Sequence, residues 1–491
     1  MKRYALTGLL VVLAALSCSR QAPSTSYTIS YRVGIQPAEH YLNVEMTYVP
    51  SGKKPADVTF RMPVWAPGYY RIMDFPKYLS DFSATDGKGQ PVRWEKTGKN
   101  GWKVDAADTL RIRYRVYANA RSVAESRVQE DMAFIAPNGV FMHVQGDVKH
   151  PVDVSFDMPA SWSRISTALD GKDGTYTAPD FDVLYDSPLL LGNHYSKTFE
   201  HEGHLYEFAL ETPQGFEESP IAQDFLKGVS ASTALFGSTA YDHYHLLLLG
   251  PGGGGLEHQA SQACYTAGHW DFDTRESYLS MLRFLTHEYF HNYNVKAIRP
   301  IELGPFDYDR EVFTPMLWIS EGFTVYYESK VLVDAGVETE QEHLDFLSSY
   351  IRDTQNTEGR RHMSMRQSSY DIWLNFFPAA SNSGETTISY YVKGPVIGLL
   401  FDATIQRMTG GQRSLDDLMR LLYNRYYREQ GRGFTEEEFW ACAEEIAGGP
   451  VPELRRYVDT TDEIDYESIL TPFGLTLDRT TWTLSKATQA P

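Results

Sequence analysis

The segment His287-Glu288-Tyr289-Phe290-His291 constrains the fold of this chain more than any other. Four residues advance an α-helix by about 400°, so the two imidazoles project from one face and can hold the same metal ion. Glu288 lies about 100° further round the helix, where its carboxylate can reach a water on that ion without ligating the metal. The pattern therefore predicts a helix that carries two metal ligands and a general base.

The residues around this motif predict a largely apolar helix between residues 278 and 294. Leu282, Leu285 and Tyr289 recur at spacings of three and four residues, which is the period of one helix face. Acidic residues precede the segment, where the helix dipole favours carboxylates, and Pro300 prevents the helix from continuing. Two histidines on such a helix need partners for their ring nitrogens, and a metal ion supplies them.

A third metal ligand is required, and Glu321 is the candidate. It lies in a segment dominated by apolar and aromatic residues, where a lone carboxylate must be paired or bound to a metal. Glu328 follows after almost two helical turns, on the same face, and is placed to accept a hydrogen bond from a ligand imidazole. Two His and one Glu with an open fourth position are typical of a catalytic zinc site. The alternative for Glu321 is a salt bridge with Arg310 or Lys330.

Four separated segments match known motifs, in the order in which those motifs occur. They are PVWAPGYY (63–70), GGGLEH (253–258), HEYFHNYNVKAIRP followed by PFDYDREVFTPMLWISEGFTVYYE (287–300 and 305–328), and YVKG (391–394). The set resembles the glycyl aminopeptidase family of zinc peptidases, which are gluzincins related to aminopeptidase N and thermolysin. The resemblance covers most of residues 27–475.

The resemblance implies two further roles that spacing does not reveal. Glu257 would bind the α-ammonium group of the substrate, and a fixed carboxylate beside the metal suits that cation. Tyr391 would donate a hydrogen bond to the tetrahedral oxyanion, with Tyr390 as the alternative donor. The residues alone also allow a tight glycine turn with a solvated Glu257, and a Tyr391 that only packs at a helix start. The family preference is for N-terminal Gly or Ala.

Composition favours a large acidic enzyme over a nucleic-acid-binding protein. The chain has 491 residues and a formal net charge of −19. A chain of this length is expected to form about two to four domains, each with room for a core. No basic stripe is present, which argues against a nucleic-acid partner and against electrostatic attraction to anionic lipid.

The N-terminus has the pattern of an export signal, residues 1–17, followed by a polar tether, residues 18–26. Lys2 and Arg3 precede an apolar stretch, 4–16, that is too short to span a bilayer. A small residue before Cys18 resembles a bacterial lipoprotein cleavage site, which predicts a membrane anchor through lipid on Cys18 and a location in the bacterial cell envelope. The residues before Ser17 depart from the commonest form of that site, so simple cleavage to a soluble periplasmic protein is the alternative.

The remaining chain is predicted to be an α+β multidomain protein. Residues 27–195 contain short alternating runs and predict a β-rich N-terminal domain. Residues 196–475 are predicted to form a thermolysin-like gluzincin catalytic domain with a helical C-terminal part, and 476–491 a tail. Ser414 is expected to open one helix, and Thr435 begins a capping box for another. Relatives commonly carry a C-terminal PDZ domain, for which we expect no room here.

These observations predict a zinc-dependent aminopeptidase with one Zn²⁺ per chain and peptides with a free N-terminus as substrates. Glu288 would take a proton from the metal-bound water and pass it to the leaving amine. Three alternatives remain at this stage. A zinc endopeptidase would share the metal site but would not need Glu257, a surface-tethered peptide-binding protein would carry a non-catalytic metal site, and an epoxide or ester hydrolase could use the same scaffold.

Overall fold

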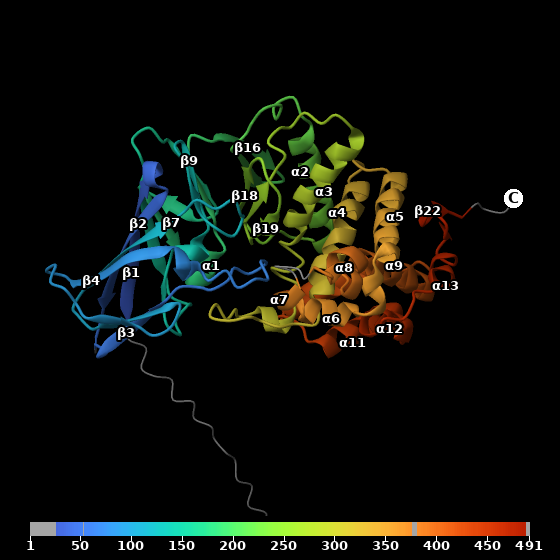
Figure 1. The fold of residues 1–491 in the computed structure, drawn as a ribbon. Coiled ribbons are helices and arrows are strands. Elements are labelled where there is room, and N and C mark those ends of the chain that lie inside the picture. The colour runs from blue at the N-terminus through green and yellow to red at the C-terminus, as the bar shows by residue number, and fades with distance from the viewer. Residues whose placement is uncertain (1–25, 53, 376–380, 488–491) are drawn as a thin grey trace, which may run out of the picture.

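The computed structural model describes residues 26–52, 54–375 and 381–487. The predicted signal peptide, Cys18, most of the predicted tether and the end of the predicted tail lie outside these residues. Figure 1 shows a β-rich first part in blue to teal and a helical second part in yellow to red. A green sheet lies between them, beside the helices α2 (Ile221–Phe236) and α3 (Arg275–Phe290) (Figure 1). The predicted α+β architecture with a β-rich N-terminal region is confirmed.

Three sheets build the N-terminal region. The largest has the strand order β13-β14-β11-β1-β2-β7-β4, and the smaller two have the orders β10-β3-β6-β5 and β12-β15-β9-β8. In β1 (Tyr27–Gln36) buried residues alternate with more exposed ones, because one face of the sheet packs on the core. The other elements here are β2 (Tyr41–Pro50), β3 (Asp57–Arg61), β4 (Leu79–Asp86), β5 (Trp94–Lys96), β6 (Gly101–Asp105), β7 (Leu110–Tyr117), β8 (Arg127–Val128), β9 (Met132–Ile135), β10 (His143–Val144), β11 (Val152–Asp157), β12 (Arg164–Thr167), β13 (Asp170–Lys172), β14 (Thr175–Ala178), α1 (Phe181–Tyr185) and β15 (Leu189–Gly192).

A five-stranded sheet carries the Gly-rich segment at its edge. Its order is β16-β17-β18-β20-β19, in which β17, β18 and β20 are parallel and the edge strand β19 is antiparallel to β20. The strands are β16 (Tyr195–His201), β17 (His204–Leu210), β18 (His243–Leu249), β19 (Gly255–Glu257) and β20 (Ser261–Tyr265). Helix α2 (Ile221–Phe236) connects β17 to β18. Helix α3 contacts both β19 and β20, so the sheet edge lies directly against the metal-motif helix.

Helix α3 (Arg275–Phe290) carries the metal motif. Thr274 caps its N-terminus through a reciprocal capping box with Ser277, which satisfies backbone N–H groups that have no partner within the helix. The helix begins a turn earlier and ends sooner than the predicted 278–294. His291 is the residue after the last helical one, but its φ of −59° and ψ of −19° keep it in the helical region. The two histidines therefore retain the one-face relation that the motif predicts.

Helices dominate the second part of the chain. A π-helical segment, Trp318–Phe323, leads directly into α4, and a second one spans Tyr423–Arg428. Ser414 caps α10 (Leu415–Leu422) and Thr435 caps α11 (Glu436–Ala447), as predicted. The remaining elements are α4 (Thr324–Asp334), α5 (Glu340–Asn356), α6 (Met365–Tyr370), α7 (Ile372–Asn375), α8 (Ser383–Thr386), α9 (Tyr390–Thr409), α10 (Leu415–Leu422), α11 (Glu436–Ala447), α12 (Pro452–Asp459), α13 (Tyr466–Leu470), β21 (Leu475–Asp478) and β22 (Thr483–Lys486).

Two apolar clusters form the core, one centred on the N-terminal sheets and one on the helical part. Tyr70 belongs to the helical cluster although its neighbours in sequence belong to the other. Close packing at Gly322 and Gly394 brings the π-helical segment against α9, since a Cβ added at Gly322 would lie 2.5 Å from the Cα of Gly394. Among the described residues, no helix is long and apolar enough to cross a membrane.

Candidate active site

Three side chains from two elements converge on one point. His287 and His291 come from α3 and its C-terminal cap, and Glu321 comes from the π-helical segment. The Nε2 atom of His291 lies 3.0 Å from Nε2 of His287 and 3.2 Å from Oε2 of Glu321. Nε2 of His287 lies 3.7 Å from the same carboxylate oxygen. All three residues are buried, and their ligand atoms lie within 4.8 Å of one another.

The outer ring nitrogens of both histidines are held by hydrogen bonds. The Nδ1–H of His287 donates to Oε2 of Glu328 over 2.7 Å, which is the contact predicted from the helical spacing. The Nδ1–H of His291 donates to the backbone carbonyl of Asn294 over 2.6 Å. Because both Nδ1 atoms donate, the lone pairs of both rings are on Nε2 and point toward the same space.

The donor set fits a divalent metal ion such as zinc. The two Nε2 atoms lie only 3.0 Å apart, so their lone pairs repel each other unless a proton or a metal cation lies between them. Oε2 of Glu321 is buried and makes no hydrogen bond that satisfies normal geometry within the described residues. Burial favours a neutral carboxyl, but the contacts with His291 and His287 outweigh it and lower the pKa of Glu321 to about 2; the same contacts raise the pKa of both imidazoles. The site thus holds an ionised carboxylate beside two imidazoles that favour positive charge, and a divalent cation would supply that charge in place of their Nε2 protons.

The salt-bridge alternative for the third ligand is wrong. Arg310 pairs instead with Asp307, at 2.6 Å between Nε and Oδ2. The ammonium group of Lys330 lies 2.8 Å from Asp334 and 3.1 Å from Asp416. Both cations are therefore engaged away from the imidazole cluster.

Glu288 and Glu257 lie beside this cluster. Ligand atoms of the two carboxylates and of His291 lie within 4.8 Å of one another. Glu288 is 6% exposed and Glu257 4% exposed, and neither carboxylate has a hydrogen bond or ion pair within residues 26–52, 54–375 and 381–487. Burial is the largest influence on Glu288 and raises its pKa to about 7, although the imidazoles act in the opposite direction. Two buried carboxylates without a direct hydrogen bond or ion pair among the described residues thus lie beside the proposed metal position.

The backbone of one glycine lies directly against each carboxylate. A Cβ added at Gly255, on the edge strand β19, would collide with the Glu288 carboxylate. A Cβ added at Gly68, in the loop between β3 and β4, would lie 2.5 Å from Oε1 of Glu257. Gly68 also has a φ of +86°, which favours glycine. The Gly-rich segment is therefore more than a turn with a solvated acid, because Glu257 is buried against another segment of the chain.

Tyr391 is the second residue of α9 and lies beside the cluster. Its ring centroid lies 6.3 Å from that of His287 and 4.8 Å from that of Tyr390. Burial and then Glu321 raise the pKa of Tyr391 well above its usual value, so its hydroxyl stays protonated and can donate. The hydroxyl of Tyr390 is fully buried and has no hydrogen-bond partner among the described residues. The more accessible Tyr391 is therefore better placed to meet a substrate.

Asp186, at the end of α1, is a residue that sequence reasoning missed. Its Oδ1 accepts from Nδ1 of His258 at 3.1 Å and from Nζ of Lys296 at 2.8 Å, and its Oδ2 accepts from the backbone N–H of Gln259 at 2.8 Å. This network ties the N-terminal domain to the segment that follows Glu257. No local spacing links Asp186 to these residues, although His258 and Lys296 both lie in motifs that the sequence singled out.

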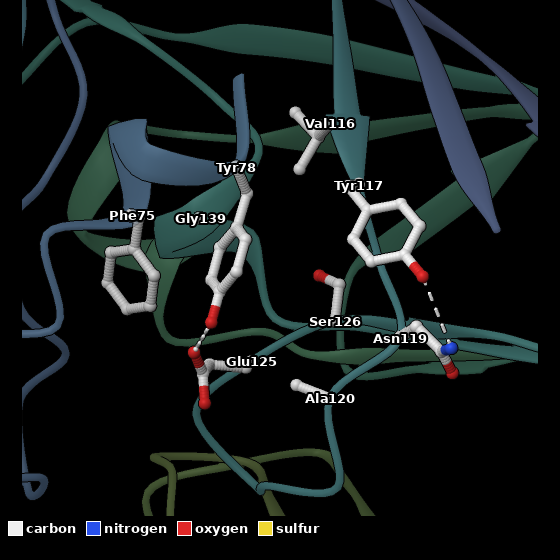
Figure 2. A pocket seen from close by; sticks show the side chains of 9 residues that line it. All are labelled: Phe75, Tyr78, Val116, Tyr117, Asn119, Ala120, Glu125, Ser126 and Gly139. Atoms are coloured by element: carbon white, nitrogen blue, oxygen red, sulfur yellow. Dashed lines mark hydrogen bonds between the residues drawn. The ribbon is translucent and has the colours of Figure 1, made fainter. Parts of the chain in front are cut away.

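The N-terminal domain contains a small cavity, which Figure 2 shows with the residues that line it. Its volume is about 70 Å³, and its lining includes Phe75, Tyr78, Tyr117 and Glu125. The Tyr78 hydroxyl donates to Glu125 at 2.7 Å, as the dashed line in Figure 2 shows. The lining contains none of the metal-ligating histidines, so this cavity is not part of the candidate active site.

Comparison with protein families agrees with this geometry. The peptidase M61 N-terminal domain matches residues 27–193, and the M61 glycyl aminopeptidase domain matches residues 280–397. The chain belongs to the M61 glycyl aminopeptidase family. It is therefore a peptidase, and the second matched region contains the imidazole cluster and Tyr391. A comparison with curated proteins gives no match.

Several solved structures have a fold similar to that of this chain. An aminopeptidase N family protein from Idiomarina loihiensis is 23% identical with a TM-score of 0.85, covering 92% of this chain and 79% of its own. An M1 zinc metallopeptidase from Deinococcus radiodurans is 15% identical with a TM-score of 0.54, covering 89% and 94%. Aminopeptidase A from Legionella pneumophila, in complex with aspartic acid, is 13% identical with a TM-score of 0.54, covering 90% and 50%. These likenesses confirm the predicted fold.

Proposed function

We propose that this peptidase is a zinc-dependent aminopeptidase that removes an N-terminal Gly or Ala from peptides. The observation that carries the proposal is the Glu257 carboxylate, which is buried beside the imidazole cluster and has no partner among the described residues. A buried, unpaired charge is costly, and a substrate cation would remove that cost. The preference for Gly or Ala rests on the family alone.

His287, His291 and Glu321 would hold the zinc ion. When bound, zinc polarises the scissile carbonyl and lowers the pKa of a bound water to about 7. Glu328 and the carbonyl of Asn294 orient the two imidazoles so that their lone pairs face the ion.

Glu288 is placed to act as the general base. Its carboxylate lies beside the ligand imidazoles but makes no hydrogen bond of its own within the described residues, so it can accept a proton from the attacking water. It then returns that proton to the amine that leaves. Tyr391 donates its hydroxyl hydrogen to the oxygen of the scissile carbonyl as negative charge develops there.

Glu257 would make the cleft an exopeptidase site. Its carboxylate faces the cluster from β19, so it can hold an α-ammonium group close to the first peptide bond. Gly68 lies against the far side of the carboxylate, and this contact supports a fixed position for the ammonium. A zinc endopeptidase would have no use for a buried carboxylate at this point.

The decisive experiment compares one short peptide with a free N-terminal Ala and the same peptide after N-acetylation. We expect cleavage of the free peptide only, because acetylation removes the cation. Glu257→Ala should retain the metal but lower kcat/KM for the free peptide by about 30- to several-thousand-fold, as expected for the loss of a desolvated charge contact worth roughly 2–5 kcal/mol. Equal cleavage of both peptides by the wild-type enzyme would favour the endopeptidase alternative.

We also propose that the mature chain is held at the bacterial cell envelope by lipid on Cys18. The apolar stretch at residues 4–16 and the small residue before Cys18 support this anchor. A labelled fatty-acid analogue should mark the wild-type protein, and Cys18→Ser should abolish the label. Unlabelled wild-type protein that is free in the periplasm would support ordinary signal cleavage instead.

A further inference from the structure

A second cavity, of about 560 Å³, lies between the N-terminal domain and the catalytic part of the chain. Residues from α1, from the loop before Gly68 and from the segment after α3 line it. Glu257 belongs to the catalytic cluster, whereas the next residue, His258, lines this cavity. None of the proposed metal ligands lines the cavity, and neither Glu257, Glu288 nor Tyr391 does, so it is distinct from the catalytic cluster.

Four cationic side chains line this cavity, and three of them form ion pairs with acidic side chains. Three are paired: Lys149 with Asp182 at 2.6 Å, Lys296 with Asp186 at 2.8 Å, and Arg432 with Glu438 at 2.6 Å. Within the part of the chain that the structure describes, the Arg299 guanidinium has neither a hydrogen bond nor an ion pair. Arg299 lies three residues after Lys296, in a motif whose role the proposed mechanism does not explain.

The surroundings of Arg299 hold its guanidinium in place without supplying an acceptor. The group packs on the backbone of Gly304, where an added Cβ would collide with it, and its central carbon lies 5.9 Å from the ring centroid of Phe306. Arg299 is half-buried, and burial lowers its pKa from the usual value. A partly desolvated guanidinium with open donors gains most from a planar anion that accepts two parallel hydrogen bonds, and a carboxylate has that geometry.

The volume and the apolar part of the lining indicate the size of the molecule that bears the carboxylate. The volume falls within the roughly 300–1,000 Å³ typical of small-molecule sites and far exceeds what a lone carboxylate fills. Ala260, Pro305 and Phe306 add apolar surface beside Arg299. We propose that this cavity binds the C-terminal carboxylate of a short peptide, with Arg299 as the bidentate donor. This site is separate from the proposed aminopeptidase cleft and does not depend on it.

The test uses N-acetyl-glycylglycine, whose blocked amine has no ammonium group to offer Glu257. Binding to the zinc-loaded wild-type enzyme is measured by isothermal titration calorimetry. Arg299→Gln should weaken binding by about 10- to 100-fold, the loss expected for a charge-assisted hydrogen bond, and the C-terminal amide of the peptide should show the same loss. Lys149→Gln is the matched control, because that cation lines the same cavity but is already paired.

Further arms separate the possible outcomes. Arg299→Lys keeps the positive charge but loses the two parallel N–H donors of the guanidinium. Its affinity for the peptide should fall between those of wild type and Arg299→Gln. Glu321→Ala should leave binding unchanged; a loss in that variant would put the peptide in the catalytic cleft and overturn the proposal. Undiminished binding to Arg299→Gln, or no binding to the wild type, would also overturn it. Acetate that binds as tightly as the peptide would show that the site takes a small acid and not a peptide terminus.

Discussion

At the scale of single residues, the proposed mechanism needs one buried carboxylate that stays ionised as a metal ligand and another that can exchange a proton as a base. Glu321 and Glu288 are both buried, but Glu321 contacts both imidazoles whereas Glu288 is enclosed by glycine backbone. The contacts lower the pKa of Glu321 to about 2, and burial raises that of Glu288 to about 7. One acid is therefore suited to stay ionised on a metal, and the other to exchange a proton near neutral pH.

Glu288→Gln tests this division of roles. The amide keeps the size of the side chain but cannot accept the proton of the attacking water, so we expect kcat to fall by about 10²- to 10⁴-fold. Zinc content, measured by elemental analysis, should stay at the wild-type level because Glu288 is not a proposed ligand. Glu321→Ala is the matched comparison and should lose the metal. Wild-type turnover in Glu288→Gln would remove Glu288 from the mechanism.

At the scale of elements, the position of Glu257 on β19 depends on the loop between β3 and β4. The backbone of Gly68 lies so close to this carboxylate that a methyl group would displace it. We therefore expect Gly68→Ala to lower kcat/KM for peptides with a free N-terminus by about 100-fold, since small misplacements of a binding group have effects of that size. Zinc content should not change, because Gly68 does not contact the metal ligands.

Gly89→Ala is the control for backbone strain in this experiment. Gly89 has a φ of +82°, close to the +86° of Gly68, but a Cβ there would have no atom within 4 Å. The two variants thus share the cost of a left-handed alanine and differ in the contact with Glu257. Equal kinetic loss in both variants would show that strain, and not displacement of the carboxylate, is responsible.

Part of the site could be predicted from the sequence. Helical spacing places His287 and His291 one turn apart on the same face, and it places Glu328 about two turns after Glu321. The hydrogen bond from His287 to Glu328 was expected because ligand imidazoles in zinc sites usually donate to a carboxylate or carbonyl. The π-helical form of Trp318–Phe323 has no comparable signal, since an i→i+5 hydrogen-bond pattern changes the spacing of side chains only slightly. The contact between Gly68 and Glu257 joins two segments that are far apart in the sequence, and no period along the chain encodes it.

At the scale of the whole molecule, buried polar contacts join the N-terminal domain to the catalytic part. Nε1 of Trp65 donates to the carbonyl of Asp307 at 2.7 Å, and Asp186 accepts from Lys296 at 2.8 Å. The side chain of Lys296 is 8% exposed. The carboxylate of Glu257 lies against Gly68 of the N-terminal domain, so the proposed ammonium site needs this domain to be correctly placed, and these contacts help to hold it there.

The Asp186 contact predicts a dependence of stability on pH. Burial opposes ionisation of Asp186, but Lys296 and His258 outweigh it and lower its pKa to about 2. An unfolded chain has an aspartate pKa of about 3.9, so ionised Asp186 favours the folded state by about 2 kcal/mol above that pH. This contribution is lost as the pH falls from about 5 toward 2, because the unfolded chain takes up the proton first. Asp186→Asn lacks it at every pH.

The free energy of unfolding by urea should therefore be lower in Asp186→Asn than in wild type at pH 7. The gap should shrink by about 1 kcal/mol between pH 5 and pH 3, and by about 2 kcal/mol in all once the pH reaches about 2. Asp57→Asn is the control, because Asp57 pairs with Lys103 at 3.2 Å while the side chains are 40% and 37% exposed, and such a surface pair contributes little. A gap that stays constant with pH would mean that Asp186 joins the domains through hydrogen bonds alone, with no contribution from its charge.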